Sequence, residues 1–160
     1  MWQRIERARI EAKPDAIWRV IADIANHHKL AGSGEVRSVT LDGPVEAGTW
    51  FTSEIDVGEV RAPFVSRNRI DVVKEPLELR WTSYPPLDPG ETELHQLEIS
   101  WWFKLTAGKG ETLVEHGFRL PKPRAGAAEL ASFLDRHARL QAIGAGMQRT
   151  LVNVRVAAGA

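Results

Sequence analysis

The chain has 160 residues, no cysteine, and equal numbers of basic and acidic side chains, 21 Lys plus Arg against 21 Asp plus Glu. This length suits a single domain, residues 1–160, that buries about two thirds of the surface of its unfolded chain. The zero net charge gives no support to a nucleic-acid partner, and the lack of cysteine excludes disulfides, thiolate nucleophiles and cysteine metal sites.

No apolar run approaches the ~20 residues that span a bilayer, so we expect no membrane span. The charged N-terminus also lacks the apolar core of a signal peptide. A cytoplasmic protein is therefore the expectation.

The first third of the chain predicts a strand followed by two short helices. An alternating segment, Gln3 to Ala12, is typical of a β-strand. Pro14 suits the first turn of a helix, where its missing N–H would be unpaired anyway, and Ala16 to Ala25 is apolar at helical spacing. Residues 23–30 indicate a helix end and a second short helix, and the glycines at 32 and 34 end it.

Six further strands are predicted, separated by glycine- and proline-containing turns. They are Glu35–Leu41, Thr49–Val57, Phe64–Val73, Leu77–Ser83, His95–Leu105 and Thr112–Leu120. The loop Tyr84–Gly90 holds three prolines and cannot pair into a sheet. In the third of these strands, Arg67 and Arg69 alternate with Asn68 and Ile70, so we expect the two arginines to point outward.

The chain closes with an amphipathic segment, Gly126 to Val156, that predicts one long helix. Its apolar stripe contains Phe133, Leu134, Leu140 and Leu151, with Met147 at one margin. Gly144 falls near the middle of that stripe, although a helical glycine costs ~1 kcal/mol relative to alanine. It serves either the close approach of a strand or large side chain, or room for a ligand.

One long helix and one antiparallel sheet can each bury their apolar face by packing on the other, which predicts an α+β fold. A strongly bent sheet around a helix can also leave a hollow that holds a small apolar molecule.

This order of elements resembles the START/Bet v 1-like (SRPBCC) superfamily, and within it the polyketide cyclase/dehydrase and lipid-transport branch. The resemblance covers almost the whole chain and is carried by the stretches ARIEAKPDAIWRVIADIANHHKLAG, GPVEAGTWF, IDVVKEPLELRW, GETLVEHGFRL and MQRTLVNVRV. It implies a helix-grip fold, a curved antiparallel sheet wrapped around a long C-terminal helix, with a deep apolar cavity. Members include carriers, sensors and cyclases. Leu30 departs from the family, which often has Trp there, at the cavity mouth.

His116 is the candidate catalytic residue. It alternates in phase with Val114 and Phe118, so it should point to the concave face of the sheet. Histidine exchanges a proton near neutral pH, which an aldol cyclisation or a dehydration requires. The alternative is a core histidine satisfied by one hydrogen bond.

The candidate ligand-binding residues are large side chains in phase on strands, together with one face of the closing helix. Trp81 and Trp101 either stack on a flat ligand or simply pack in the core. His137 and Gln141, four residues apart, either hydrogen-bond a ligand or mark the helix boundary with water. The full predicted set is Trp81, Trp101, Phe103, Val114, Phe118, Phe133, His137, Leu140, Gln141, Gly144 and Met147.

No cofactor or metal is predicted. The sequence has no P-loop, Rossmann fingerprint or nucleophile elbow. Its five histidines show no paired ligand spacing of a zinc site.

Three functions remain open at this point. The first is binding of a small hydrophobic or aromatic ligand, the second is a cyclase or dehydratase that uses His116 as acid and base, and the third is a domain that modulates a protein partner without a ligand. The sequence also leaves a homodimer open. An internal cavity of several hundred cubic ångströms would favour the first two functions.

Overall fold

A computed structural model describes residues 1–86 and 97–160, and contains a seven-stranded antiparallel sheet. The strands lie in the order β1-β7-β6-β5-β4-β3-β2. Their bounds are β1 Trp2–Ile10, β2 Val36–Leu41, β3 Trp50–Ile55, β4 Phe64–Lys74, β5 Glu78–Tyr84, β6 Ile99–Ala107 and β7 Thr112–Leu120. Every neighbouring pair is antiparallel, and the predicted first strand pairs with β7 at the edge of the sheet. The predicted strand start at His95 and residues 87–90 of the proline loop lie outside the described residues.

Short helices follow the first strand, as the sequence predicts. They are α1 Pro14–Ile21, the 3₁₀ turn η1 Ile24–Asn26 and α2 His27–Leu30. Pro14 occupies the first turn of α1, and the helix buries Ile17, Trp18 and Ile21 against the sheet end. A second 3₁₀ turn, η2 Gly58–Val60, joins β3 to β4.

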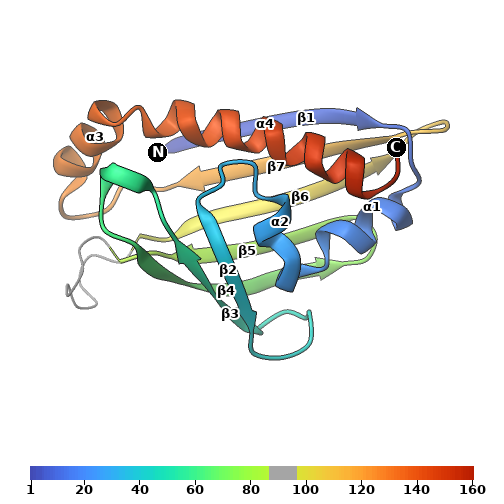
Figure 1. Cartoon of the computed structure of the whole chain (residues 1–160), viewed down its shortest axis with the longest axis horizontal. Coiled ribbons are helices and arrows are strands. Elements are labelled where there is room, and N and C mark those ends of the chain that lie inside the picture. Colours follow the sequence, from blue (N-terminus) through green and yellow to red (C-terminus); the bar gives the residue numbers. More distant parts are fainter. Residues whose placement is uncertain (87–96) are drawn as a thin grey trace.

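The predicted closing helix is two helices, not one. α3 spans Ala127–Arg136 and α4 spans Arg139–Ala157. Between them Ala138 adopts φ 47°, in the left-handed region, which ends one helix and redirects the next. The break lets α3 pack Leu130 and Leu134 across the end of the sheet, while α4 runs along it beside β1 (Figure 1).

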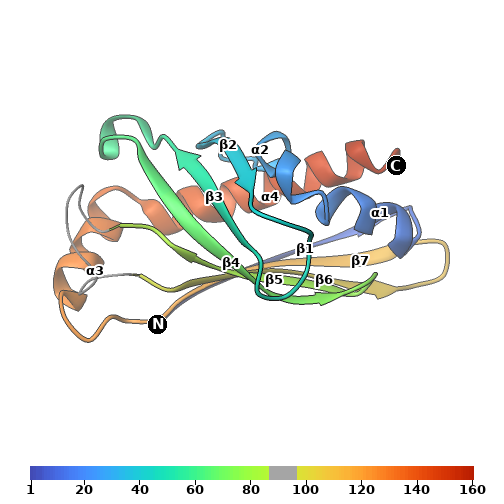
Figure 2. The same cartoon turned by 90° about the horizontal axis from the view of Figure 1, so that it is seen from below.

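The sheet curves around α4, which makes this a helix-grip fold of the α+β class. Figure 2 shows β2 and β3 rising from the rest of the sheet toward the level of α4. α2 and α1 cover the same side of the sheet near the C-terminal end of α4 (Figure 1). None of the helices in the described parts of the chain is both long and apolar enough to cross a membrane.

Among residues 1–86 and 97–160, buried apolar side chains form two clusters. The larger joins α1 to the inner faces of β5, β6 and β7 and to the last turns of α4, through residues such as Ile17, Leu79 and Val154. The smaller joins α3 to β7 and Met147 of α4. Members of both clusters line the cavity described below.

The loop after α2 docks directly on α4. The backbone N–H of Gly32 donates to Thr150 Oγ1 at 2.9 Å, and Asn153 Nδ2 donates to the Leu30 carbonyl at 2.9 Å. A side chain at position 32 would overlap the Gly146 carbonyl, so glycine at position 32 permits this approach. Leu30, Gly32 and Thr150 all line the cavity described below.

A candidate ligand-binding cavity

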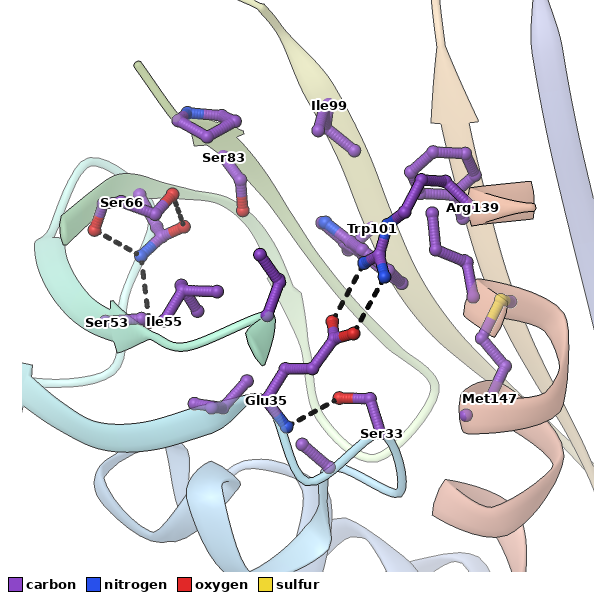
Figure 3. Close-up of a pocket in the computed structure, with 18 of the residues that line it drawn as sticks. Ser33, Glu35, Ser53, Ile55, Ser66, Ser83, Ile99, Trp101, Arg139 and Met147 are labelled. Carbon is purple, nitrogen blue, oxygen red and sulfur yellow. Dashed lines mark hydrogen bonds and ion pairs between the residues drawn. The ribbon is translucent and has the colours of Figure 1, made fainter. Parts of the chain in front are cut away.

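A cavity of about 300 Å³ lies between the inner face of the sheet and α4. This volume falls at the lower end of the usual range for small-molecule sites. Figure 3 shows the side chains around it, with serines of β3, β4 and β5 on one side and Trp101, Arg139 and Met147 on the other. Its lining comes from β2 to β7 and from α2, α3 and α4.

One end of the cavity is closed by the larger core cluster. Trp81, Phe103 and His116 line the cavity on β5, β6 and β7. The next inward-facing residue of each strand belongs to the core cluster and does not line it: Leu79, Leu105 and Val114. The opposite end is lined by Pro85, Leu97, Leu120, Leu130 and Phe133.

Aromatic rings form the wall on the sheet side. The indoles of Trp81 and Trp101 are nearly parallel, with 6.5 Å between centroids and 12° between planes. Phe103 and His116 stack more closely, at 4.1 Å and 6°. Phe118 meets Trp101 edge-on at 4.9 Å. These rings come together because directly opposed residues of antiparallel strands place their side chains on the same face.

His116 is held in one tautomer by the backbone. Its Nδ1 lies 3.0 Å from the carbonyl oxygen of Trp102 on β6. A carbonyl can only accept, so Nδ1 carries the proton and Nε2 carries a lone pair in the neutral ring. Burial lowers the pKa of His116 from 6.5 to about 4, against the opposing effect of this hydrogen bond. The ring is therefore neutral at pH 7.

His27 is a second neutral imidazole of the cavity lining. Its Nε2 donates to the carbonyl oxygen of Ile21 at 2.6 Å, which leaves a lone pair on Nδ1. Burial lowers the pKa of His27 as well. Its ring lies 5.5 Å from Trp81 and 6.4 Å from Phe103, so it joins the closed end of the cavity.

A buried amide organises the polar side of the cavity. Asn68, only 2% exposed, donates from Nδ2 to the Phe51 carbonyl and to Ser53 Oγ, both at 3.2 Å. Its Oδ1 accepts from Ser66 Oγ at 3.3 Å. Ser83 faces Asn68 across β4 and β5 and also lines the cavity. These hydroxyls supply a few fixed polar groups on an otherwise apolar surface.

An ion pair spans the cavity lining between β2 and α4. Arg139 donates from Nη1 and Nη2 to the two carboxylate oxygens of Glu35, at 2.9 and 3.0 Å (Figure 3). Arg139 follows the helix break at Ala138, and Glu35 directly precedes β2. The bidentate geometry fixes the start of α4 to the far side of the cavity.

The structure brings together most of the sequence-predicted site residues. His116, the predicted catalytic residue, lies in the cavity wall. So do these predicted ligand-binding residues: Trp81, Trp101, Phe103, Phe118, Phe133 and Met147.

The remaining predicted residues lie elsewhere. Val114 is fully buried in the larger core cluster, and Leu140 packs against the smaller one. His137 caps α3 with its ring 4.9 Å from Phe133, and Gln141 is exposed on α4. Gly144 faces β1 and not the cavity, because a Cβ at this position would meet Glu6 and Arg4. The glycine therefore does not enlarge the cavity. Val114 departs from expectation because the core cluster fills that end of β7, and His137 because it ends α3 at the break before α4.

Several cavity residues were missed by the sequence reading. Asn68 had a signal, since it shares the phase of buried Ile70 between two outward arginines. His27 had a weaker one, at the end of an apolar helical run. Glu35 and Arg139 had none, because they are 104 positions apart. Within residues 1–86 and 97–160, no three His, Asp or Glu side chains are placed to hold a metal ion.

No known protein family and no curated protein matches this sequence. Solved structures do match its fold. Protein MLL2253 from Mesorhizobium loti is 15% identical, with a TM-score of 0.68 over 98% of this chain and 96% of that one. The KanY protein ms6282 is 13% identical, with a TM-score of 0.69 over the full length of both chains.

A further similar structure is the di-domain ARO/CYC StfQ from the steffimycin biosynthetic pathway. It is 10% identical, with a TM-score of 0.73 over 98% of this chain, and the match spans 50% of StfQ. At these identities the likeness establishes the helix-grip fold and nothing finer.

Proposed function

We propose that this protein binds a small, flat, largely apolar molecule in the cavity between its sheet and α4. The observation that carries the proposal is the aromatic closed end, where Trp81, Phe103 and His116 wall a cavity of about 300 Å³. Aromatic and aliphatic surface with few fixed polar groups is typical of small-molecule sites. The proposal agrees with the resemblance to the START/Bet v 1-like superfamily, and the similar fold of StfQ supports it.

A cyclase or dehydratase is the second candidate, since His116 lies in the cavity wall. The small protonated fraction of His116 argues against a role as general acid. With a pKa of about 4, about one imidazole in a thousand is protonated at pH 7. A general acid needs a pKa close to the working pH. A ring that stays neutral and a wall that is mostly aromatic favour binding without chemical change as the first candidate.

The test uses the uncharged dye N-phenyl-1-naphthylamine, whose emission rises in apolar surroundings. Burial of its rings at ~25 cal/mol per Å² supplies micromolar affinity after the costs of association. The blocking variant is Met147→Trp, because Met147 is 2% exposed and lines the cavity. We expect this variant to weaken dye binding by about tenfold or more.

The matched control is Val152→Trp, on the same helix at a position that is 50% exposed. It should bind the dye as the unmodified protein does, with circular dichroism reporting that both variants are folded. Absence of binding at high micromolar dye in folded protein would contradict the proposal. Unchanged affinity in folded Met147→Trp would contradict it too.

A further inference from the structure

Two histidine rings at the closed end of the cavity each use their one N–H on a backbone carbonyl. Each ring therefore has its second nitrogen left as a hydrogen-bond acceptor. His116 Nδ1 and His27 Nε2 both donate to backbone carbonyls, so each proton is directed away from any ligand. The second nitrogen of each ring, Nε2 of His116 and Nδ1 of His27, has no hydrogen-bond partner among the described residues. Both rings line the cavity.

A polar atom that opens into an apolar cavity gains stability when it finds a hydrogen-bond partner there. His116 is 4% exposed and stacks with Phe103 and Trp101, and neither ring donates a hydrogen bond to it. The Trp102 indole N–H is on the other face of β6, where it donates to Glu115 at 2.9 Å. A donor for His116 Nε2 must therefore come from inside the cavity, from water or from a ligand.

We propose that the cavity selects a flat aromatic molecule that carries a hydrogen-bond donor, such as a phenolic hydroxyl, and that His116 Nε2 accepts that hydrogen bond. This inference rests on the proposed function, because it names the chemical class of the ligand for the same cavity. The aromatic wall of Trp81, Trp101 and Phe103 packs the ring. A carbonyl or ether at the same place would bring a lone pair against a lone pair.

Matched naphthalenes test the proposal at pH 7, where phenols keep their proton. 2-Naphthol carries the donor, 2-methylnaphthalene replaces the hydroxyl by a group of similar size, and 2-methoxynaphthalene keeps the oxygen without its proton. Burial of apolar surface alone ranks the methyl compound first. We expect the opposite order by calorimetry, with 2-naphthol binding about tenfold more tightly than either analogue.

The variant His116→Phe keeps an aromatic ring and removes the acceptor. This variant should bind 2-naphthol and 2-methylnaphthalene with about equal affinity. His137→Phe is the control, because His137 contacts Phe133 at the end of α3 and does not line the cavity. This control should keep the tenfold preference.

A second measurement needs no variant, so the proposal stays testable if His116→Phe does not fold. The ¹⁵N shifts of the histidine rings should report His116 as the Nδ1–H tautomer, and 2-naphthol should shift its Nε2 resonance. Equal affinity for the three compounds, a preference retained in folded His116→Phe, or an Nε2–H tautomer would overturn the inference while leaving the proposed function intact. Failure of all three compounds to bind would overturn both.

Discussion

At the scale of single residues, the cavity depends on imidazoles that the fold keeps neutral. His116 gives up solvation on burial and keeps one backbone hydrogen bond, and its pKa falls to about 4. The position of this residue follows from the sequence, because the alternation of Val114, His116 and Phe118 predicts the inner face of a strand. Its tautomer does not, because the tautomer depends on the Trp102 carbonyl of the neighbouring strand.

The lowered pKa makes stability depend on pH. Above the unfolded-state pKa of about 6.5, neither state holds the proton, and the stability is complete. Between pH 6.5 and about pH 4, the unfolded chain binds a proton at position 116 that the native protein does not bind. The free energy of unfolding therefore falls as the pH is lowered through this range. For this one residue the loss from pH 7 to pH 4.5 is about 2 to 3 kcal/mol.

Urea unfolding at the two pH values measures this loss. The variant His116→Phe should lose less stability than the unmodified protein by about that amount, since it has no proton to bind. His27, whose pKa burial also lowers, stays in both proteins, so the difference between them reports His116 together with its repulsion of His27. Between pH 7 and pH 8 the two proteins should show the same pH dependence. An identical loss down to pH 4.5 would show that His116 titrates normally.

At the scale of elements, strands were predictable and the helix break was not. The strand bounds follow the alternation of apolar residues, and β2, β4 and β5 match expectation to within one residue at each end. Arg67 and Arg69 point outward as expected, with Arg69 paired to Asp71 at 2.8 Å. The break at Ala138 carries no glycine or proline, so nothing local announces it. It is set by α3 packing over the sheet end.

Replacing two glycines by alanine, one in β7 and one in α4, should change the stability of the protein in opposite directions. In β7, a Cβ on Gly117 would overlap the indole of Trp102, which donates to Glu115 and lies 4.8 Å from the Arg80 guanidinium. Gly117→Ala should cost about 1–3 kcal/mol through overpacking. In α4, a Cβ on Gly144 meets Glu6 Oε1 at an ordinary 3.8 Å, so Gly144→Ala should gain up to about 1 kcal/mol.

Chemical denaturation of both variants gives the two free energies. In a Trp102→Ala background the cost of Gly117→Ala should shrink, because the two residues are in contact. A Gly117→Ala protein as stable as the unmodified one would refute the packing assigned to Trp102. Destabilisation by Gly144→Ala would show that position 144 requires glycine for close approach.

At the scale of the whole molecule, a hollow between sheet and helix was predictable, but its boundaries were not. The sequence indicates a curved sheet and a long helix whose apolar stripe must be buried against that sheet. The closed end depends on where one core cluster stops, between Val114 and His116 on β7. The far wall depends on Glu35 and Arg139, whose pairing is a product of the folded chain.

A crystal structure of the protein with 2-naphthol tests whether this hollow is a binding site for a donor-bearing aromatic. We expect the naphthalene ring in the closed end, against Trp101 and Phe103, with its hydroxyl oxygen about 2.8 Å from His116 Nε2. A cavity filled by side chains would contradict this description. So would 2-naphthol found only on the outer surface, at a concentration that saturates the protein with 2-naphthol in solution.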